Sequence, residues 1–197
     1  AGQLKNQFLE IIDLCSKSDP LSITHKAMGD RSLKNLSLSY LGSLKEHETT
    51  DLIWNHYESA KNMTDELAGF KILSEIDADI KLKTVERFYS KWKHDKLVLD
   101  KWFAVQAGST LPDTLEVVKS LTEHPDFSIK NPNKVRSLIY MFALQNPVNF
   151  HQVDGSGYRF VADQIVLLDE INHQISGRLS SCFNHWKKYD DQRKSLM

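Results

Sequence analysis

Apolar side chains recur along this chain at intervals of three and four residues, the periodicity of one buried face of an α-helix. Short polar or helix-breaking segments separate the runs, and Asp19-Pro20 is the first of them. No stretch shows the strict alternation of a half-buried strand. The pattern predicts helices over residues 4–15, 33–41, 52–60, 64–73, 85–92, 97–107, 112–121, 132–142, 158–171 and 174–186.

About ten helices joined by short turns predict an all-α fold built from antiparallel helix pairs. No strict repeat with a period of roughly 34 to 47 residues is visible, which argues against a regular repeat array. The sequence therefore favours an irregular α-solenoid, a superhelical stack of helix pairs, with residues 1–197 forming a single domain. Such stacks offer a concave face on which partners bind.

Polar residues mark where several of these helices should begin. Asn131 and Asn133 are N-cap candidates, and Pro132 suits a first helical turn because its missing N–H would be unpaired there. Arg136 consequently lies on a helix with a strongly capped start. Thr64 is the candidate cap of the helix over 64–73, followed by acidic residues that suit the positive end of the helix dipole.

The charge balance and the apolar runs argue against two classes of partner. The net charge of −1 lacks the basic excess of a nucleic-acid surface. No apolar run approaches the roughly 18 residues that a membrane helix needs. The sequence therefore predicts neither a nucleic-acid partner nor a membrane partner.

Cys15 and Cys182 lie far apart, each in an apolar helical stripe. Buried free thiols are the favoured interpretation, with a disulfide as the alternative. Free thiols favour a reducing compartment, so we expect a cytoplasmic protein. The first ten residues lack the apolar core of a signal peptide and resemble the middle of a helical region. We therefore expect the sequence to be part of a longer chain.

The segment His47-Glu48-Thr49-Thr50-Asp51 partly matches a zinc-protease helix. That motif needs histidines four residues apart on one helical face, with a glutamate between them as general base. Here Asp51 occupies the second ligand position. We therefore expect a solvated turn between two helices, with an N-cap at Thr50 or Asp51, and no metal site.

The segment Gly155-Ser156-Gly157 is superficially similar to a dinucleotide-binding loop. Phe160 stands where the third glycine of that motif belongs, and no strand precedes the segment. We expect a turn in which Asp154 bonds the local backbone and Gly157 precedes a helix.

Two arginines and one glutamine border the predicted buried stripes of their helices. Gln174 and Arg178 are four residues apart and therefore side by side on the last helix, and Arg136 borders the stripe of its own helix. In one interpretation the arginines snorkel or form ion pairs between helices. In the other, both guanidinium groups line one cavity and donate to carbonyl or carboxylate oxygens of a bound peptide. The residues alone leave both interpretations open.

Several short phrases occur in an order and spacing that is specific to one family, over roughly residues 27 to 197. They are Lys61-Asn62-Met63-Thr64-Asp65, Leu97-Val98-Leu99-Asp100-Lys101-Trp102-Phe103, Asn131-Pro132-Asn133 with Arg136-Ser137-Leu138-Ile139, Asn146-Pro147 with Phe150-His151, Asp154-Gly155-Ser156-Gly157-Tyr158, and Gln174 with Arg178-Leu179. With them the chain resembles the C-terminal helical domain of the bacterial aminopeptidase N family, zinc metallo-aminopeptidases of the gluzincin type.

The resemblance implies a domain of a larger enzyme, a peptide hydrolase. The family's H-E-x-x-H zinc helix and its G-A-M-E-N segment do not occur in this sequence. Zinc and catalysis would therefore belong to a catalytic domain of the same polypeptide, which is this chain's implied partner. The chain itself would hold no cofactor and no catalytic residue, and it would be inactive in isolation.

In that family the helical domain lies over the zinc site, encloses a chamber and restricts the substrate to short peptides and loose ends. Positions matching Arg136, Gln174 and Arg178 line the chamber near the substrate residues downstream of the scissile bond. The resemblance thus implies a peptide substrate and these three substrate-binding residues. A different class of function is kept as the alternative, a free-standing α-solenoid adaptor that binds a partner protein and has no catalytic role.

Overall fold

The computed structural model describes residues 2–76 and 78–197, and the chain divides into two compact units. The first unit spans Ala1–Ser90 and the second spans Lys91–Met197. Within the described residues every regular element is helical and no strand occurs. The prediction of an all-α fold is therefore confirmed.

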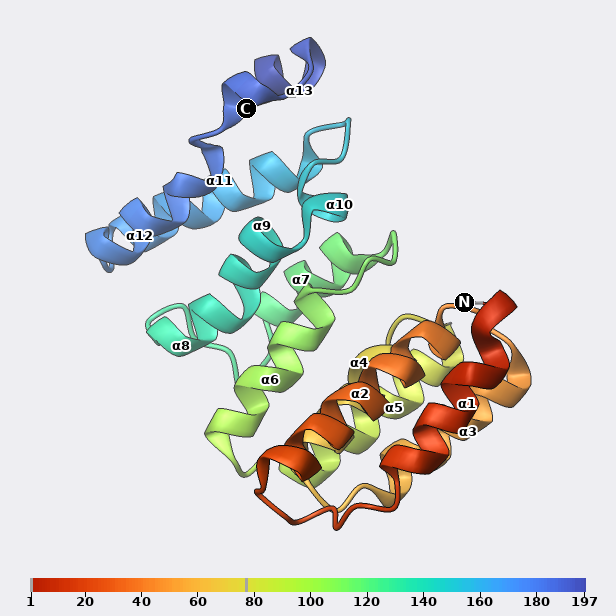
Figure 1. Ribbon diagram of the computed structural model, residues 1–197. Coiled ribbons are helices and arrows are strands. Elements are labelled where there is room, and N and C mark those ends of the chain that lie inside the picture. Colours follow the sequence, from red (N-terminus) through yellow and green to blue (C-terminus); the bar gives the residue numbers. More distant parts are fainter. Residues whose placement is uncertain (1, 77) are drawn as a thin grey trace. The chain divides into compact units, whose positions relative to one another are not determined.

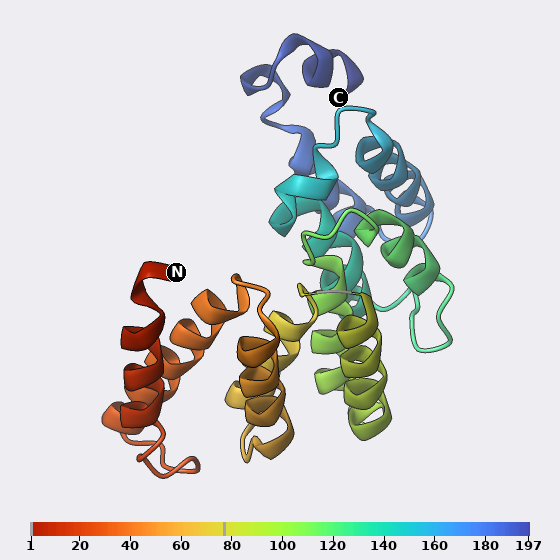
Figure 2. The same cartoon turned by 90° about the vertical axis from the view of Figure 1, so that its right-hand side faces the viewer.

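The first unit is built from antiparallel helix pairs (Figure 1). Its helices are α1 (Lys5–Cys15), α2 (His25–Gly42), α3 (His47–Ser59), α4 (Met63–Leu73) and α5 (Ala78–Trp92), the last of which ends just inside the second unit. Helix α1 packs on α2 and α3 packs on α4, while α2 also contacts α4, as Figure 2 shows from a second side. The side chains buried between them include Leu38, Leu41, Ile53, Phe70, Leu73 and Phe88.

A buried carboxylate ties α2 to the start of α4. Lys34 Nζ donates to Asp65 Oδ2 at 3.0 Å, and the two side chains are 11% and 4% exposed. Asn35 and Asn62 each donate a further side-chain hydrogen bond of 3.0 Å to the same carboxylate. Burial alone would raise the pKa of Asp65, but the donors from Lys34, Asn62 and Asn35 hold that pKa below its ordinary value. Asp65 is therefore ionised at neutral pH and serves the packing of the unit.

The predicted N-cap of α4 is wrong by two residues. Asn62, not Thr64, is the N-cap, and its Oδ1 accepts from the backbone N–H of Asp65 at 2.9 Å. An asparagine caps a helix as well as a threonine does, so the sequence offered two starts and the structure uses the earlier one.

The predicted turn at residues 47–51 is also wrong, because helix α3 begins at His47. Glu46 is the N-cap residue without a side-chain cap, and its carbonyl accepts from the hydroxyls of Thr49 and Thr50. His47 Nδ1 lies 3.0 Å from Asp51 Oδ2, and both side chains are largely exposed. The segment is therefore the first helical turn of α3, with His47, Glu48 and Asp51 exposed and Thr49 buried.

The second unit contains α6 (Lys96–Ala107), α7 (Thr114–Thr122), α8 (Pro132–Val135), α9 (Met141–Gln145), α10 (Pro147–Phe150), α11 (Ser156–Asp169), α12 (His173–Ser180) and α13 (Asp191–Leu196). A π-helical turn, η2 (Arg136–Tyr140), joins α8 to α9. The prediction that Asn131 caps this helix is confirmed, since Asn131 Oδ1 accepts from the Asn133 N–H at 3.0 Å. The η2 turn packs on α6, and α11 packs on α12.

Gly157 lies at a close crossing between α10 and α11. It is the second residue of α11, so the prediction that it precedes the helix is wrong, and the helix begins at Ser156, two residues earlier than predicted. A Cβ at Gly157 would lie 2.5 Å from the backbone oxygen of Phe150 and 3.0 Å from that of Asn149. The prediction that Asp154 bonds the local backbone is confirmed by its 2.9 Å bond from the Ser156 N–H.

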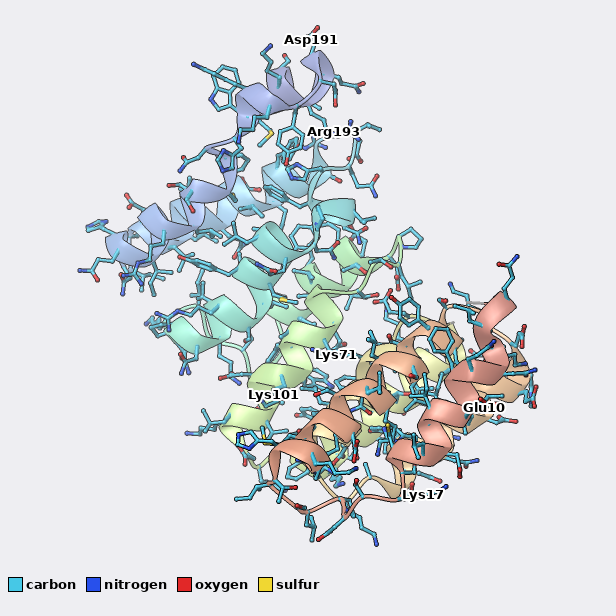
Figure 3. All side chains as sticks on the ribbon, in the orientation of Figure 1. Glu10, Lys17, Lys71, Lys101, Asp191 and Arg193 are labelled. Carbon is cyan, nitrogen blue, oxygen red and sulfur yellow. The ribbon has the colours of Figure 1, made fainter. Side chains whose placement is uncertain are left out.

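The last predicted helix ends earlier than expected, because α12 stops at Ser180 and short 3₁₀ turns follow, η3 (Ser181–Phe183) and η4 (Trp186–Lys188). The hydroxyls of Ser180 and Ser181 bond the backbone carbonyls of the preceding turn, which competes with continued helix formation. Trp186 is 40% exposed rather than part of a buried stripe. Arg193 of α13, labelled in Figure 3, instead anchors the tail by donating from Nε to the His151 carbonyl at 2.7 Å.

We predict that Lys34→Ala lowers the free energy of unfolding by about 3 kcal/mol, because it leaves the Asp65 carboxylate buried without its cation. Urea denaturation followed by circular dichroism measures this. Lys26→Ala, which removes an exposed pair with Asp30, is the control and should cost less than about 1 kcal/mol. Equal costs for both variants would contradict the structural role of Asp65.

The pKa of Asp65 is lowered in the folded state. The contribution of Asp65 to the free energy of unfolding is therefore present above its unfolded pKa of about 3.9 and is lost as the pH falls through the folded value.

We predict that Gly157→Ala destabilises the chain by about 1–3 kcal/mol, because its methyl group would collide with the backbone of α10. Gly177→Ala is the matched control, since a Cβ there meets no atom within 4 Å and the residue lies inside α12. That control should stabilise by about 0.5–1 kcal/mol through helix propensity. Thermal unfolding of both variants checks the opposite signs, and a neutral Gly157→Ala would show that the crossing is looser than described.

Candidate functional site

The structure brings Arg136 and Arg178 to one place in the second unit, around the phenol of Tyr140. Arg136 opens the η2 turn, and Arg178 lies in α12. Tyr140 Oη donates to the backbone oxygen of Ile175 at 2.7 Å, so the two elements are directly linked. Burial raises the pKa of Tyr140, and the positive charges of Arg178 and Arg136 both act on it in the opposite direction. Both guanidinium groups therefore lie within electrostatic range of one hydroxyl.

Neither of these arginines has an acidic partner among the described residues. Arg136 Nη1 donates to Asn133 Oδ1 at 3.1 Å, a neutral amide one turn earlier. The guanidinium of Arg178 makes no hydrogen bond or ion pair within the described part of the chain. Both side chains are exposed. The described residues therefore do not form the ion pair between helices that the first interpretation of the sequence included.

The other arginines of the chain are occupied. Arg87 pairs with Glu58 and Arg193 with Asp190. Arg31 donates to two backbone carbonyls and Arg159 donates to one. Arg136 and Arg178, like Arg159, keep most of their donors available to a ligand, and they differ from Arg159 in acting together on the Tyr140 phenol.

Local sequence explains why Gln174 and Arg178 share an edge of α12. Asn172 caps this helix, accepting from the N–H groups of Gln174 and Ile175 at 3.1 and 3.2 Å. Ile175 and Leu179 face the interior and are buried. Gln174 and Arg178, four residues apart, are both exposed. The structure does not test whether Gln174 contacts a substrate, which stays a prediction.

The helix that carries Arg136 likewise buries one face and exposes the other. Val135, Leu138 and Ile139 are fully buried, which leaves Arg136 on the solvent side. The neighbouring Lys134 is instead drawn inward, with Nζ 2.8 Å from Asp100 Oδ1. Lys134 thus forms a buried ion pair, whereas Arg136, two residues later, stays exposed to solvent.

The sequence reasoning missed Tyr140 as part of this site. Its position four residues after Arg136 places it near that arginine on a helix, and this spacing is visible in the sequence. The π-helical form of the turn has no comparable local signal. Such turns are rare and occur frequently at functional sites.

A polar hollow of about 440 Å³ lies in the second unit, with Leu144, His151, Cys182 and Tyr189 among its lining residues. The lining includes neither Tyr140 nor the two arginines. Cys182 links the hollow to Tyr140, because it also acts on the Tyr140 phenol. Burial raises the pKa of Cys182 to about 12, and that thiol is therefore protonated and unreactive at neutral pH.

His151 lines this hollow and is held in place by two hydrogen bonds. Its ring bonds the hydroxyls of Tyr158 and Tyr189, both at 2.8 Å. Burial, and then the charge of Arg193, lower the pKa of His151 below its ordinary value. His151 is therefore neutral at pH 7, and the hollow offers hydrogen-bonding groups rather than charge.

Both cysteines are free thiols, as predicted, but only Cys15 is buried and Cys182 is partly exposed. Among residues 2–76 and 78–197, no group of three His, Cys, Asp or Glu side chains is arranged to hold a metal ion. Among the described helices, none combines the length and the apolar character needed to cross a bilayer.

Comparison with known proteins identifies relatives over the whole chain. The family described as "Domain of unknown function (DUF3458_C) ARM repeats" matches residues 1–197. The aminopeptidase N of Haemophilus influenzae is 37% identical over 197 residues, which are 100% of this chain and 22% of that protein. The Caulobacter vibrioides aminopeptidase N is 38% identical over 171 residues, which are 87% of this chain and 20% of that protein. The Escherichia coli aminopeptidase N is 34% identical over 197 residues, 100% of this chain and 22% of that protein.

A solved structure has the same fold. Legionella pneumophila aminopeptidase A, in complex with aspartic acid, superposes with a TM-score of 0.91 and 34% sequence identity, over 100% of this chain and 24% of that one. The chain thus spans 20–24% of the length of these relatives. Sequence and fold agree over the full length, and the chain belongs to the DUF3458_C family of ARM-repeat domains, the C-terminal helical domains of the aminopeptidase N type.

Proposed function

We propose that this chain is the helical domain of a zinc-dependent aminopeptidase that removes N-terminal residues from peptides. The domain encloses the active-site chamber and contacts the part of the peptide downstream of the scissile bond. One observation carries the proposal: two guanidinium groups act on the same phenol, that of Tyr140, and neither has an acidic partner among the described residues.

Two such guanidinium groups suit the oxygens of a peptide. Each presents a planar fork of N–H donors that matches a carbonyl or carboxylate oxygen, and its charge strengthens the bond. Gln174, on the same edge of α12 as Arg178, adds an amide that donates and accepts. The proposed role of Arg136, Gln174 and Arg178 is therefore to bind and orient the substrate, while bond cleavage occurs elsewhere in the enzyme.

The zinc of the proposed enzyme belongs to the catalytic domain of the same polypeptide. The described residues of this chain offer no set of ligands that fits the ion. When bound in its own domain, zinc activates the water that attacks the peptide bond. This chain contributes walls and hydrogen-bond donors to that reaction.

The names of the relatives favour this function over that of a free-standing adaptor. Curated relatives that match the chain at 34–38% identity are called aminopeptidase N, and each is four to five times as long, since the chain covers 20–22% of them. A cytoplasmic location is part of the proposal, and it rests on the two free thiols.

In the full-length enzyme, we predict that Arg136→Ala and Arg178→Ala each raise KM for a tripeptide by roughly tenfold or more, the loss of a charge-assisted hydrogen bond. A single-residue chromogenic amide has no downstream residues, so its KM should change less than about twofold. Steady-state kinetics on both substrates measures the difference. Arg159→Ala is the control, because this exposed arginine of the same unit bonds only the Asp154 carbonyl. Equal effects on both substrates would remove the basis for the proposed site.

We predict that the isolated 197-residue chain hydrolyses neither alanyl nor leucyl chromogenic amides, even with added zinc. The reason is that its described residues include no metal-ligand group, and its half-buried thiol at Cys182 is protonated. An assay of the repurified chain, with and without chelator, checks this. Activity that survives repurification and disappears with chelator would show that the chain carries catalytic groups of its own.

A further inference from the structure

We propose that Tyr140 is a positioning residue that holds Arg136 and Arg178 at a fixed separation, so that both donate to the same bound peptide. This inference rests on the proposed function. It adds a residue that need not touch the substrate and acts through the two arginines.

The geometry of the Tyr140 hydroxyl carries the inference. Tyr140 lies four residues after Arg136, and its bond partner Ile175 lies three residues before Arg178. Residues three and four apart are neighbours on a helix, so one hydrogen bond connects the two segments within a helical turn of each arginine. The bond is 2.7 Å long and part-buried, and it spans 35 positions of sequence. A shift of α12 against η2 would lengthen it and change the separation of the guanidinium groups.

The like charges give this link a role. Arg136 and Arg178 both lie close enough to Tyr140 to act on its phenol, and like charges in one neighbourhood repel each other. The bond from Tyr140 to the Ile175 carbonyl holds the two backbone segments together against that repulsion.

The π-helical form of η2 fits this role. A π turn contains one residue more than an α turn. At about 100° per residue, this extra residue rotates the following side chains about the helix axis. Arg136 and Tyr140 are the first and last residues of the turn. The local distortion therefore acts on the two residues that the proposal connects.

The test is Tyr140→Phe in the full-length enzyme, which removes the hydroxyl and keeps the ring. Tyr158→Phe is the matched control, because its hydroxyl also makes one part-buried bond between segments, to His151 at 2.8 Å, and the residue does not line the hollow. We expect Tyr140→Phe to raise KM for Ala-Ala-Ala roughly three- to tenfold, the effect of one hydrogen bond. Its kcat, its KM for a single-residue amide and its Tm should match those of Tyr158→Phe.

Coupling between the arginines gives a second measurement. In the enzyme that keeps Tyr140, the effects of Arg136→Ala and Arg178→Ala on tripeptide KM should not add, because the Tyr140 bond couples the two segments that carry the arginines. In the Tyr140→Phe background they should add. Unchanged coupling, or a Tyr140→Phe enzyme no different from Tyr158→Phe while the arginine variants lose peptide affinity, overturns this inference and leaves the proposed function intact. Arginine variants without any peptide-selective loss overturn both.

Discussion

The hydrogen bond from Tyr140 to the Ile175 carbonyl is the contact on which the candidate site depends. It joins the π turn that carries Arg136 to the helix that carries Arg178, across a distance of 2.7 Å between the two oxygens. The packing around it serves the same end, because buried Leu138 and Ile139 anchor one segment and buried Leu179 anchors the other. With their helices held in this way, two like charges remain neighbours without an acidic partner among the described residues.

We propose that such an arrangement binds substrate and leaves catalysis to another domain. Burial keeps the Cys182 thiol protonated at neutral pH, so this thiol is not a nucleophile there. A domain of this kind adds shape, donors and positive charge to a reaction whose chemistry lies in another part of the polypeptide. In the proposed enzyme it therefore acts on substrate affinity more than on the rate of bond cleavage.

Much of this was readable from the sequence, and the failures have physical causes. Helical periodicity, the Asn131 cap and the i, i+4 spacing of Gln174 and Arg178 are local signals, and the structure agrees with them. The start of α3 was missed because Glu46 caps it without a side-chain bond. The early end of α12 depends on serine hydroxyls that compete for backbone carbonyls. The π turn and the Tyr140 contact depend on packing between segments 35 residues apart, which no local pattern encodes.

A crystal structure of the full-length enzyme with a non-hydrolysable tripeptide analogue would show whether the two arginines bind the peptide together. We predict that guanidinium nitrogens of both Arg136 and Arg178 lie about 2.7–3.1 Å from oxygens of the analogue downstream of the scissile position. We also predict that the Tyr140 hydroxyl keeps its bond to Ile175. An analogue bound in the chamber with either guanidinium directed away from it, toward bulk solvent, would show that the two arginines do not bind the peptide together.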